Sequence, residues 1–388
     1  MKKVLAKVIH GIVYITYIVL FWLLFPISNI FYGRKRIWLI NERGYDARDN
    51  GYHFFKYVVS NHPEIKCFYA IDKKSSDYKN IKQFNNILQF GSLKHIFFFT
   101  CAKAKISSQM YGYAPNKYYV KYMENHHLQG KNIGLKHGIF KNIHPNYFKE
   151  RSHLDLIICG AEPEYKFIKD NFGYKDDEVA YCGLARFDNL LNNKPKKQIL
   201  VMPTFRIPLS GMTKEEFSKT DYFKKWSIFL KNLDERLDDW SNYQAIFYIH
   251  AVFQKYVSLF FGIYKNIVIA KFEEYDVQAL LKESSILVTD YSSVFFDFAY
   301  MRKPTIFYQF DEQFFNANHY EKGYFDYKRD GFGNVFYDER LCVNEVCRLL
   351  DKNCKIDDVF NDKIDKFFTL PRDNNNCDRI FKEIKRII

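Results

Sequence analysis

The chain has 388 residues, a net charge of +13, 47% apolar residue types and 19% aromatic residues. This composition excludes a disordered protein, and its single long apolar run excludes a polytopic membrane protein. At about 150 residues per domain, the length predicts two domains that each bury a core. The positive charge favours an anionic partner: nucleic acid, a phosphorylated substrate or an acidic membrane surface.

Eight cysteines are scattered along the chain without a C-x-x-C pair or a regular spacing. This pattern is typical of reduced thiols in a cytoplasmic protein, several of them in the core. Three histidines near residue 140, namely His127, His144 and His153, match no zinc-binding spacing. We therefore expect no metal site.

The first predicted element is the apolar run Val8–Phe25, which is preceded by lysines and followed by a basic cluster at 34–36. No small-residue cleavage site follows the run, so we expect it to be retained rather than removed as a signal peptide. Its length is marginal for a bilayer span, and its basic flanks favour a helix at or in the cytoplasmic leaflet. We expect residues 1–35 to associate with the cytoplasmic face of the membrane, peripherally or as a single anchor. A buried core helix is the alternative.

Short apolar runs then alternate with amphipathic ones through residues 36–193. The runs that predict buried strands are Ile37–Ile40, Lys66–Ile71, Lys105–Ser108, Asn132–Leu135 and Leu154–Cys159. Helical periodicity lies between them, at Gly51–Val59, Leu93–Ala104 and Glu162–Asn171. This alternation predicts a first lobe over residues 36–193.

A second series follows Asn193-Lys194-Pro195, the expected linker. Its predicted strands are Gln198–Met202, Gln244–His250, Asn266–Ala270, Ser285–Asp290 and Thr305–Phe310. Its predicted helices are Phe223–Trp240, Asp276–Glu283 and Ser293–Met301. The repeated alternation predicts an α/β fold with two parallel-sheet lobes, the second over 194–340, followed by C-terminal helices over 341–388 that begin near Asn344 as an N-cap.

Ligands of such lobes bind where loops leave the carboxyl ends of the strands. His137, followed by Gly138, comes directly after a predicted strand, and its imidazole suits proton removal from a hydroxyl near neutral pH. His250 ends another predicted strand. From these residues alone, a capping or core role is the commoner explanation for His137 and an equal one for His250.

The strongest local pattern is Ser284–Asp297, where an apolar strand ends in Thr289-Asp290 and Ser292-Ser293 then precede a helical run. Ser292 as an N-cap would place hydroxyls and free N–H groups at a positive helix end, which suits an anion. Helix capping without a ligand explains the pattern equally well. The chain has no G-x-x-x-x-G-K, G-x-G-x-x-G, G-x-S-x-G or Asp-x-Asp motif, which argues against P-loop ATPases, simple dinucleotide enzymes, α/β serine hydrolases and many metal-dependent sugar transferases.

Taken in order, six elements resemble motifs of the CDP-glycerol glycerophosphotransferase family, the teichoic acid primases and polymerases. The elements are Trp38–Glu42 with Asp49-Asn50-Gly51, Lys136-His137-Gly138, Gly183–Leu190, Met202–Arg206, Val288–Ser293, and Phe296–Ala299 with Lys303-Pro304. Three positions depart from the family's pattern: Ala251 follows His250 in place of a proline, Phe205 replaces a tryptophan, and Met202 replaces an alanine.

The resemblance implies two Rossmann-like lobes of the GT-B type, an acceptor-side lobe followed by a donor-side lobe. It implies that an acceptor hydroxyl attacks the β-phosphorus of CDP-glycerol and releases CMP, without a cofactor or metal, and that the acceptor is carried on a polyprenyl lipid. His137 would be the general base and His250 a catalytic cation. The residues implied to hold the donor diphosphate are Arg206, Thr289, Ser292 and Ser293. The residues implied on the acceptor side are Asn50, Gly138 and Lys141.

Two rival enzymes remain open at this point: a CDP-ribitol ribitolphosphotransferase and a GT-B glycosyltransferase that uses a nucleotide sugar. A non-catalytic nucleic-acid or membrane-binding protein is a third class. We expect no nucleic-acid partner, because the basic residues are dispersed and no motif interleaves them with aromatic residues. The sequence also lacks a counterpart of the long N-terminal region of the large polymerases. This is compatible with a primase-like or short-polymer role and leaves primase and polymerase both open.

Overall fold

The computed structural model describes residues 2–32, 37–126, 128–191, 194–240, 242–318 and 321–388, and these form two compact units. The first unit comprises Met1–Ile139, Pro145–Asn189 and Leu370–Ile388. The second comprises Phe140–His144 and Leu190–Thr369. The basic cluster at 34–36, the linker residue Asn193 and His127 lie outside the described residues.

The first unit is built on a seven-stranded parallel sheet with the order β3-β2-β1-β4-β5-β6-β7. Its strands are β1 (Trp38–Asn41), β2 (Cys67–Ile71), β3 (Ile87–Gln89), β4 (Ala104–Ser107), β5 (Lys131–Gly134), β6 (Leu156–Cys159) and β7 (Val179–Tyr181). This is the doubly wound order, and its direction of growth reverses between β1 and β4.

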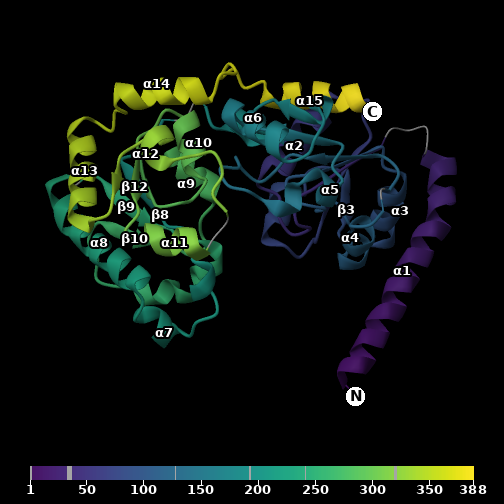
Figure 1. Cartoon of the computed structure of the whole chain (residues 1–388), viewed down its shortest axis with the longest axis horizontal. Coiled ribbons are helices and arrows are strands. Elements are labelled where there is room, and N and C mark those ends of the chain that lie inside the picture. Colours follow the sequence, from purple (N-terminus) through teal and green to yellow (C-terminus); the bar gives the residue numbers. More distant parts are fainter. Residues whose placement is uncertain (1, 33–36, 127, 192–193, 241, 319–320) are drawn as a thin grey trace. The chain divides into compact units, whose positions relative to one another are not determined.

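Helices connect these strands and cover the sheet (Figure 1). They are α1 (Lys2–Tyr32), α2 (Asn50–Asn61), α3 (Leu93–Cys101), α4 (Lys117–Met123), α5 (Lys149–Ser152), α6 (Glu162–Asn171) and α15 (Asn376–Ile387). The last of these returns from the end of the chain, and Phe381 packs against Trp38 of β1 with ring centroids 5.3 Å apart. Asp188 caps this helix by accepting hydrogen bonds from the N–H groups of Asn376 and Cys377.

The second unit repeats the architecture with a six-stranded parallel sheet, ordered β10-β9-β8-β11-β12-β13. Its strands are β8 (Gln198–Met202), β9 (Gln244–Phe247), β10 (Ile267–Ile269), β11 (Ile286–Thr289), β12 (Thr305–Tyr308) and β13 (Val335–Phe336). The order reverses between β8 and β11, so each unit has one such switch point. The predicted fold class, two parallel-sheet lobes with an apolar N-terminal helix, is confirmed.

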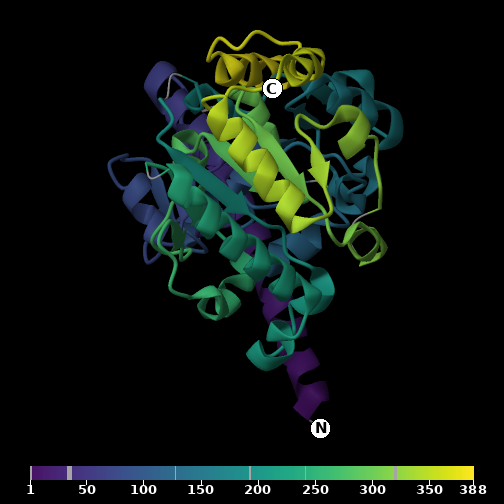
Figure 2. The same cartoon turned by 90° about the vertical axis from the view of Figure 1, so that its left-hand side faces the viewer.

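The helices of the second unit are α7 (Lys214–Ser218), α8 (Asp221–Leu237), α9 (Val277–Glu283), α10 (Phe295–Tyr300), α11 (Glu312–Asn318), α12 (Tyr327–Asp330), α13 (Glu339–Asp351) and α14 (Asp358–Phe367). Helices α8 and α13 lie against one face of the sheet (Figure 2). Trp226 of α8 is fully buried there and meets Tyr308 of β12 edge to face. The sequence pattern of α8, with large apolar residues three or four positions apart, is what this one-sided burial requires.

Each predicted strand coincides with an observed strand to within three residues at either end. Two predicted helix starts are wrong. Helix α10 begins at Phe295 with Val294 as its N-cap, because a tight turn from Ser293 O to Phe296 N precedes it and neither serine caps it. Helix α13 begins before Asn344, at Glu339, because the Asp338 carboxylate accepts the N–H groups of the first turn.

Candidate active site

The carboxyl ends of three strands in the first unit lie side by side. Asn41 of β1 pairs in register with Ser107 of β4, which pairs with Gly134 of β5. The loop Glu42–Asp49 therefore leaves the same edge of the sheet as the loop that carries His137. This edge is at the switch point, where ligands of doubly wound sheets bind.

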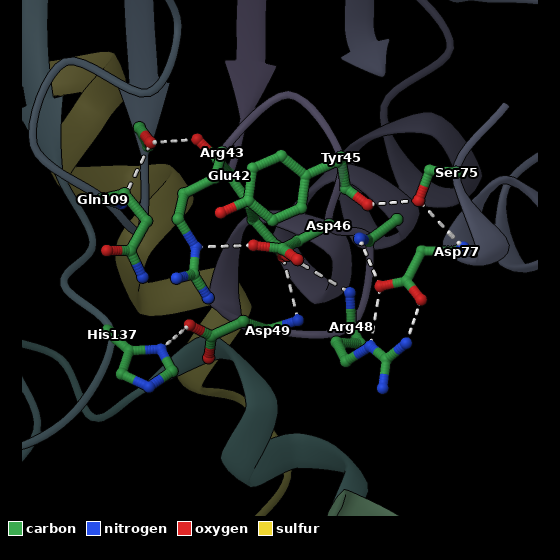
Figure 3. Close-up of polar contacts among 12 residues, drawn as sticks. Glu42, Arg43, Tyr45, Asp46, Arg48, Asp49, Ser75, Asp77, Gln109 and His137 are labelled. Carbon is green, nitrogen blue, oxygen red and sulfur yellow. Dashed lines mark hydrogen bonds and ion pairs between the residues drawn. The ribbon is translucent and has the colours of Figure 1, made fainter. Parts of the chain in front are cut away.

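His137 and Asp49 meet at this edge (Figure 3). His137 Nδ1 lies 2.5 Å from Asp49 Oδ2, and the histidine side chain is 65% exposed. Burial by itself would raise the pKa of Asp49, but the charges of His137 and Arg186 outweigh it and lower the pKa to about 2. An ionised Asp49 holds the proton on Nδ1, which leaves Nε2 able to accept a proton.

Three further groups fix Asp49 in place. Its second carboxylate oxygen accepts a hydrogen bond from Arg186 at 2.9 Å. The buried Glu42 carboxylate accepts the N–H groups of Arg48, Asp49 and Tyr52, which shapes the loop after β1. Burial and the charge of Asp49 raise the pKa of Glu42 to about 8. Arg48 in turn pairs with Asp77, so the loop is tied to the rest of the unit.

The backbone before His137 is held by buried polar contacts. Lys136 has a φ of 58°, a left-handed conformation that is uncommon for a non-glycine residue, and its ammonium forms a fully buried ion pair with Glu164. Asn50 donates to Lys136 O at 2.7 Å and accepts from Arg186 N at 3.0 Å. Asn50, predicted on the acceptor side, is thus buried and joins two loops. Gly138, which follows His137 in the chain, is also buried.

Three strand ends also align in the second unit, where Met202 of β8, Thr289 of β11 and Phe307 of β12 are in register. The loops that follow these strands bring Arg206, Asp290 and Asp311 together. Arg206 lies 2.8 Å from each carboxylate, and its side chain is 1% exposed. Burial alone would lower the pKa of Arg206, but the two carboxylates raise it above its ordinary value.

Arg206 directs its donors to protein groups: Nε and Nη2 to Asp311, Nη2 to Asp290 and Nη1 to Thr204 O. The Asp290 carboxylate also accepts the N–H groups of Thr204 and Tyr291. This arrangement makes Arg206 a buried strut that fixes the loops after β8 and β11. The family resemblance implied a direct contact between Arg206 and the donor diphosphate.

The predicted donor-side hydroxyls differ in their surroundings. Thr289 is buried and donates to Met202 O at 2.7 Å, so its hydroxyl joins β11 to β8. Ser292 and Ser293 are half-buried, and within the described residues their hydroxyls make no hydrogen bond. These two serines are therefore the predicted hydroxyls that remain available to a ligand.

Two further predicted site residues, Lys141 and His250, have basic side chains. Lys141, predicted on the acceptor side, belongs to the second unit, where its ammonium donates to Tyr291 O at 2.8 Å. Burial lowers the pKa of Lys141 to about 8, against the opposing charge of Asp290. His250 Nδ1 accepts the N–H of Val252 at 3.2 Å, which places the ring proton on Nε2. Its ring stacks on Phe205 at 4.7 Å, so Phe205 supplies an aromatic surface where the family has tryptophan.

No role was predicted from the sequence for Asp49, Arg186, Asp290 or Asp311. The first three lie inside the motifs on which the family resemblance rests, and this position could have identified them as candidate site residues. Asp311 lies outside them, and only the strand register brings it to Arg206. Among the described residues, no three His, Cys, Asp or Glu side chains gather at metal-binding geometry.

Two parallel sheets, each with polar groups at its switch point, define a two-lobe protein of the GT-B class. The chain belongs to the CDP-Glycerol:Poly(glycerophosphate) glycerophosphotransferase family, whose model matches residues 24–386. The family resemblance inferred from the six motifs is thereby confirmed.

Named relatives agree with this assignment. The chain is 30% identical to the minor teichoic acid biosynthesis protein GgaB of Bacillus subtilis (strain 168), over 99% of this chain and 41% of that protein. It is 22% identical to a teichoic acid glycerol-phosphate transferase of Staphylococcus aureus, over 94% of this chain and 92% of that protein. A variant of the wall teichoic acid polymerase TagF has the same fold, with a TM-score of 0.73, 16% identity and coverage of 99% and 98% of the two chains. The chain spans 41% and 46% of two B. subtilis relatives.

Proposed function

We propose that this protein transfers glycerol phosphate from CDP-glycerol to a hydroxyl of a lipid-linked acceptor and releases CMP. The family assignment supports this reaction, and so does a TagF structure soaked with CDPG, which matches 91% of this chain with a TM-score of 0.69. The observation that carries the proposal is the His137–Asp49 pair at 2.5 Å, because it prepares an exposed imidazole to take a proton.

In the proposed mechanism, His137 Nε2 takes the proton of the acceptor hydroxyl. The oxygen forms a new bond to the β-phosphorus of the donor, and the bond from that phosphorus to the bridging oxygen breaks, so that CMP leaves with the electron pair. Asp49 stabilises the imidazolium that forms, since its lowered pKa keeps it ionised at neutral pH.

The second unit would hold the donor. Phosphoryl transfer depends mainly on positioning and on donors or cations around the phosphates. Ser292 and Ser293 supply hydroxyls, while Lys141 and the Nε2–H of His250 supply a cation and a donor. Arg206 acts indirectly, because it holds the Asp290 loop that presents the two serines.

We propose that the enzyme works at the cytoplasmic face of the membrane, where a polyprenyl-linked acceptor is accessible, with helix α1 as the contact. Helix α1 supports this location because the segment Val8–Phe31 has a mean hydropathy of 2.2 and is long enough to cross a membrane.

A donor panel tests the reaction. Purified protein is given an extract of polyprenyl-linked acceptors with CDP-glycerol, CDP-ribitol or a UDP-sugar, and nucleotide release is measured. We expect CMP release from CDP-glycerol. Release from CDP-ribitol alone would mean that the donor carries ribitol instead of glycerol. We include CDP-ribitol because the chain is 25% identical, over 54% of its length, to the ribitol-phosphate polymerase TarL of S. aureus. Turnover of the UDP-sugar alone would overturn the proposed reaction class.

A further inference from the structure

The loop after β1 presents the guanidinium of Arg43 at the surface. The chain turns at Gly44, whose φ of 72° lies in the left-handed region that favours glycine. The Arg43 side chain is 52% exposed, and its Nε donates to Asp46 at 2.7 Å. The guanidinium carbon lies 5.5 Å from the ring centroid of Tyr45, at the distance of a cation–π contact. A carboxylate and an aromatic ring thus orient this side chain.

The protein uses only one nitrogen of this guanidinium. Within the described part of the chain, Nη1 and Nη2 of Arg43 make no hydrogen bond. Burial by itself would lower the pKa of Arg43, but its contact with Asp46 and the charges of Tyr45 and Asp49 raise it. The side chain is therefore a cation with two parallel donors left over. Such a fork matches two oxygens of one phosphate group.

A second donor, Gln109, reaches the same place from the loop after β4. Ser107 Oγ donates to Glu42 O at 3.4 Å and accepts from Gln109 N at 3.0 Å. Glu42 immediately precedes Arg43 in the chain, so the two loops meet where these side chains begin. Gly112 permits this approach, because a Cβ there would collide with Glu42 O. The Gln109 amide is half-buried, and among the residues that the structure describes it has no partner.

These donors lie on the side of the site that carries the His137 imidazole. Arg43, Gln109 and His137 follow β1, β4 and β5, whose ends are in register. Figure 3 shows the side chains of Arg43 and Gln109 extending toward His137. Asp49, the partner of His137, also acts by its charge on Arg43. A ligand whose hydroxyl reaches His137 can therefore place a neighbouring anionic group on Arg43 and Gln109.

We propose that Arg43 and Gln109 form a subsite for a phosphate group of the acceptor. The Nη nitrogens of Arg43 bind two phosphate oxygens, the Gln109 amide donates to the same phosphate, and the acceptor hydroxyl is thereby directed to His137. This inference rests on the proposed function, because it concerns the acceptor of that reaction. The product of one transfer has a phosphodiester next to free glycerol hydroxyls, so it carries the required chemistry. A donor phosphate is the other source of the same chemistry.

Protection of His137 from diethyl pyrocarbonate tests the subsite without turnover, so the result does not depend on the donor panel. Mass spectrometry of the His137 peptide gives the rate of modification in the full chain. Protection is the ratio of the rates without and with ligand in each variant, so a changed reactivity of the imidazole itself does not enter. The probe is sn-glycerol 3-phosphate in phosphate-free buffer, and glycerol is its control. We expect protection by glycerol 3-phosphate and none by glycerol.

Arg43→Met should raise the glycerol 3-phosphate concentration for half-protection about 10-fold or more, because hydrogen bonds to a charged group contribute a factor of roughly 10–100. Gln109→Ala removes a neutral donor and should raise it by a factor of roughly 2–10. The matched control is Arg386→Met. Arg386 also pairs through Nε with a carboxylate three residues away, Glu383 at 2.8 Å, and is 43% exposed. This variant should be protected like the parent protein.

Two results of the protection experiment would overturn the proposal: equal half-protection concentrations for the parent and Arg43→Met, or equal protection by glycerol. Equilibrium binding of CDP-glycerol separates the two sources of phosphate. We expect Arg43→Met to bind CDP-glycerol as the parent does. A loss of CDP-glycerol affinity about as large as the loss of protection would assign Arg43 to the donor and would also overturn the proposal.

Discussion

His137→Ala is expected to lower kcat by about 10³-fold or more, because general base catalysis contributes on the order of 10²–10⁴. The dissociation constant of CDP-glycerol should stay the same, since His137 acts on the acceptor hydroxyl. Initial rates of CMP release and equilibrium donor binding measure the two effects. The exposed His126, whose ring nitrogen lies 2.9 Å from Tyr122 O just after α4, provides a control: His126→Ala should keep the parent rate.

Asp49→Asn should reproduce most of that loss, on the order of 10²–10⁴-fold in kcat, because an amide cannot hold the imidazole in the required tautomer or stabilise its cation. Arg186 and Glu42 would still shape the loop. Near-normal turnover by either variant, with the fold intact by circular dichroism, would remove the His137–Asp49 pair from the mechanism.

Arg206→Met is expected to lower the free energy of unfolding by about 3–5 kcal/mol, because it leaves the fully buried Asp290 carboxylate without its cation. Urea unfolding followed by tryptophan fluorescence measures this loss, since Trp226 packs in the core of the same unit. The physical reason is the desolvation of an unpaired charge, which a partly exposed ion pair does not suffer.

Arg348 supplies the matched control. It also pairs with two carboxylates, Glu345 and Asp357, but its side chain is 34% exposed. Arg348→Met should therefore cost only about 1 kcal/mol or less. Equal losses of stability for the two arginine variants would contradict the role of Arg206 as a buried strut.

The double variant Ser292→Ala with Ser293→Ala should keep the parent stability and weaken CDP-glycerol binding.

The sequence predicted the regular elements well where a strand is buried on both faces. Gln198–Met202 coincides with β8 because a parallel strand of that kind is a continuous apolar run. Strands β3, β7 and β13 were not predicted, because two or three residues at or near a sheet edge carry too little pattern. The domain boundaries depend on the return of α15 to the first unit, a long-range contact that no local pattern reports.

The candidate site also contains residues that could be predicted from the sequence and residues that could not. His137 was predicted because a strand, a histidine and a glycine are adjacent in the sequence. Its partner Asp49 is 88 residues away, and only the register of β1, β4 and β5 brings the two together. Arg206 was predicted to contact a phosphate. Its carboxylate partners Asp290 and Asp311 follow two other strands, so their proximity to Arg206 cannot be read from the sequence. Pairing of charges between loops is a property of the folded sheet.

The central claim is that glycerol phosphate passes from CDP-glycerol to an acceptor hydroxyl. The most direct measurement uses CDP-glycerol labelled in the glycerol carbon and follows the label and CMP together, with and without polyprenyl-linked acceptor. Our account predicts one labelled glycerol phosphate on the acceptor for each CMP released, and no release by His137→Ala. CMP release that is independent of acceptor, with the label found as free glycerol phosphate, would contradict it.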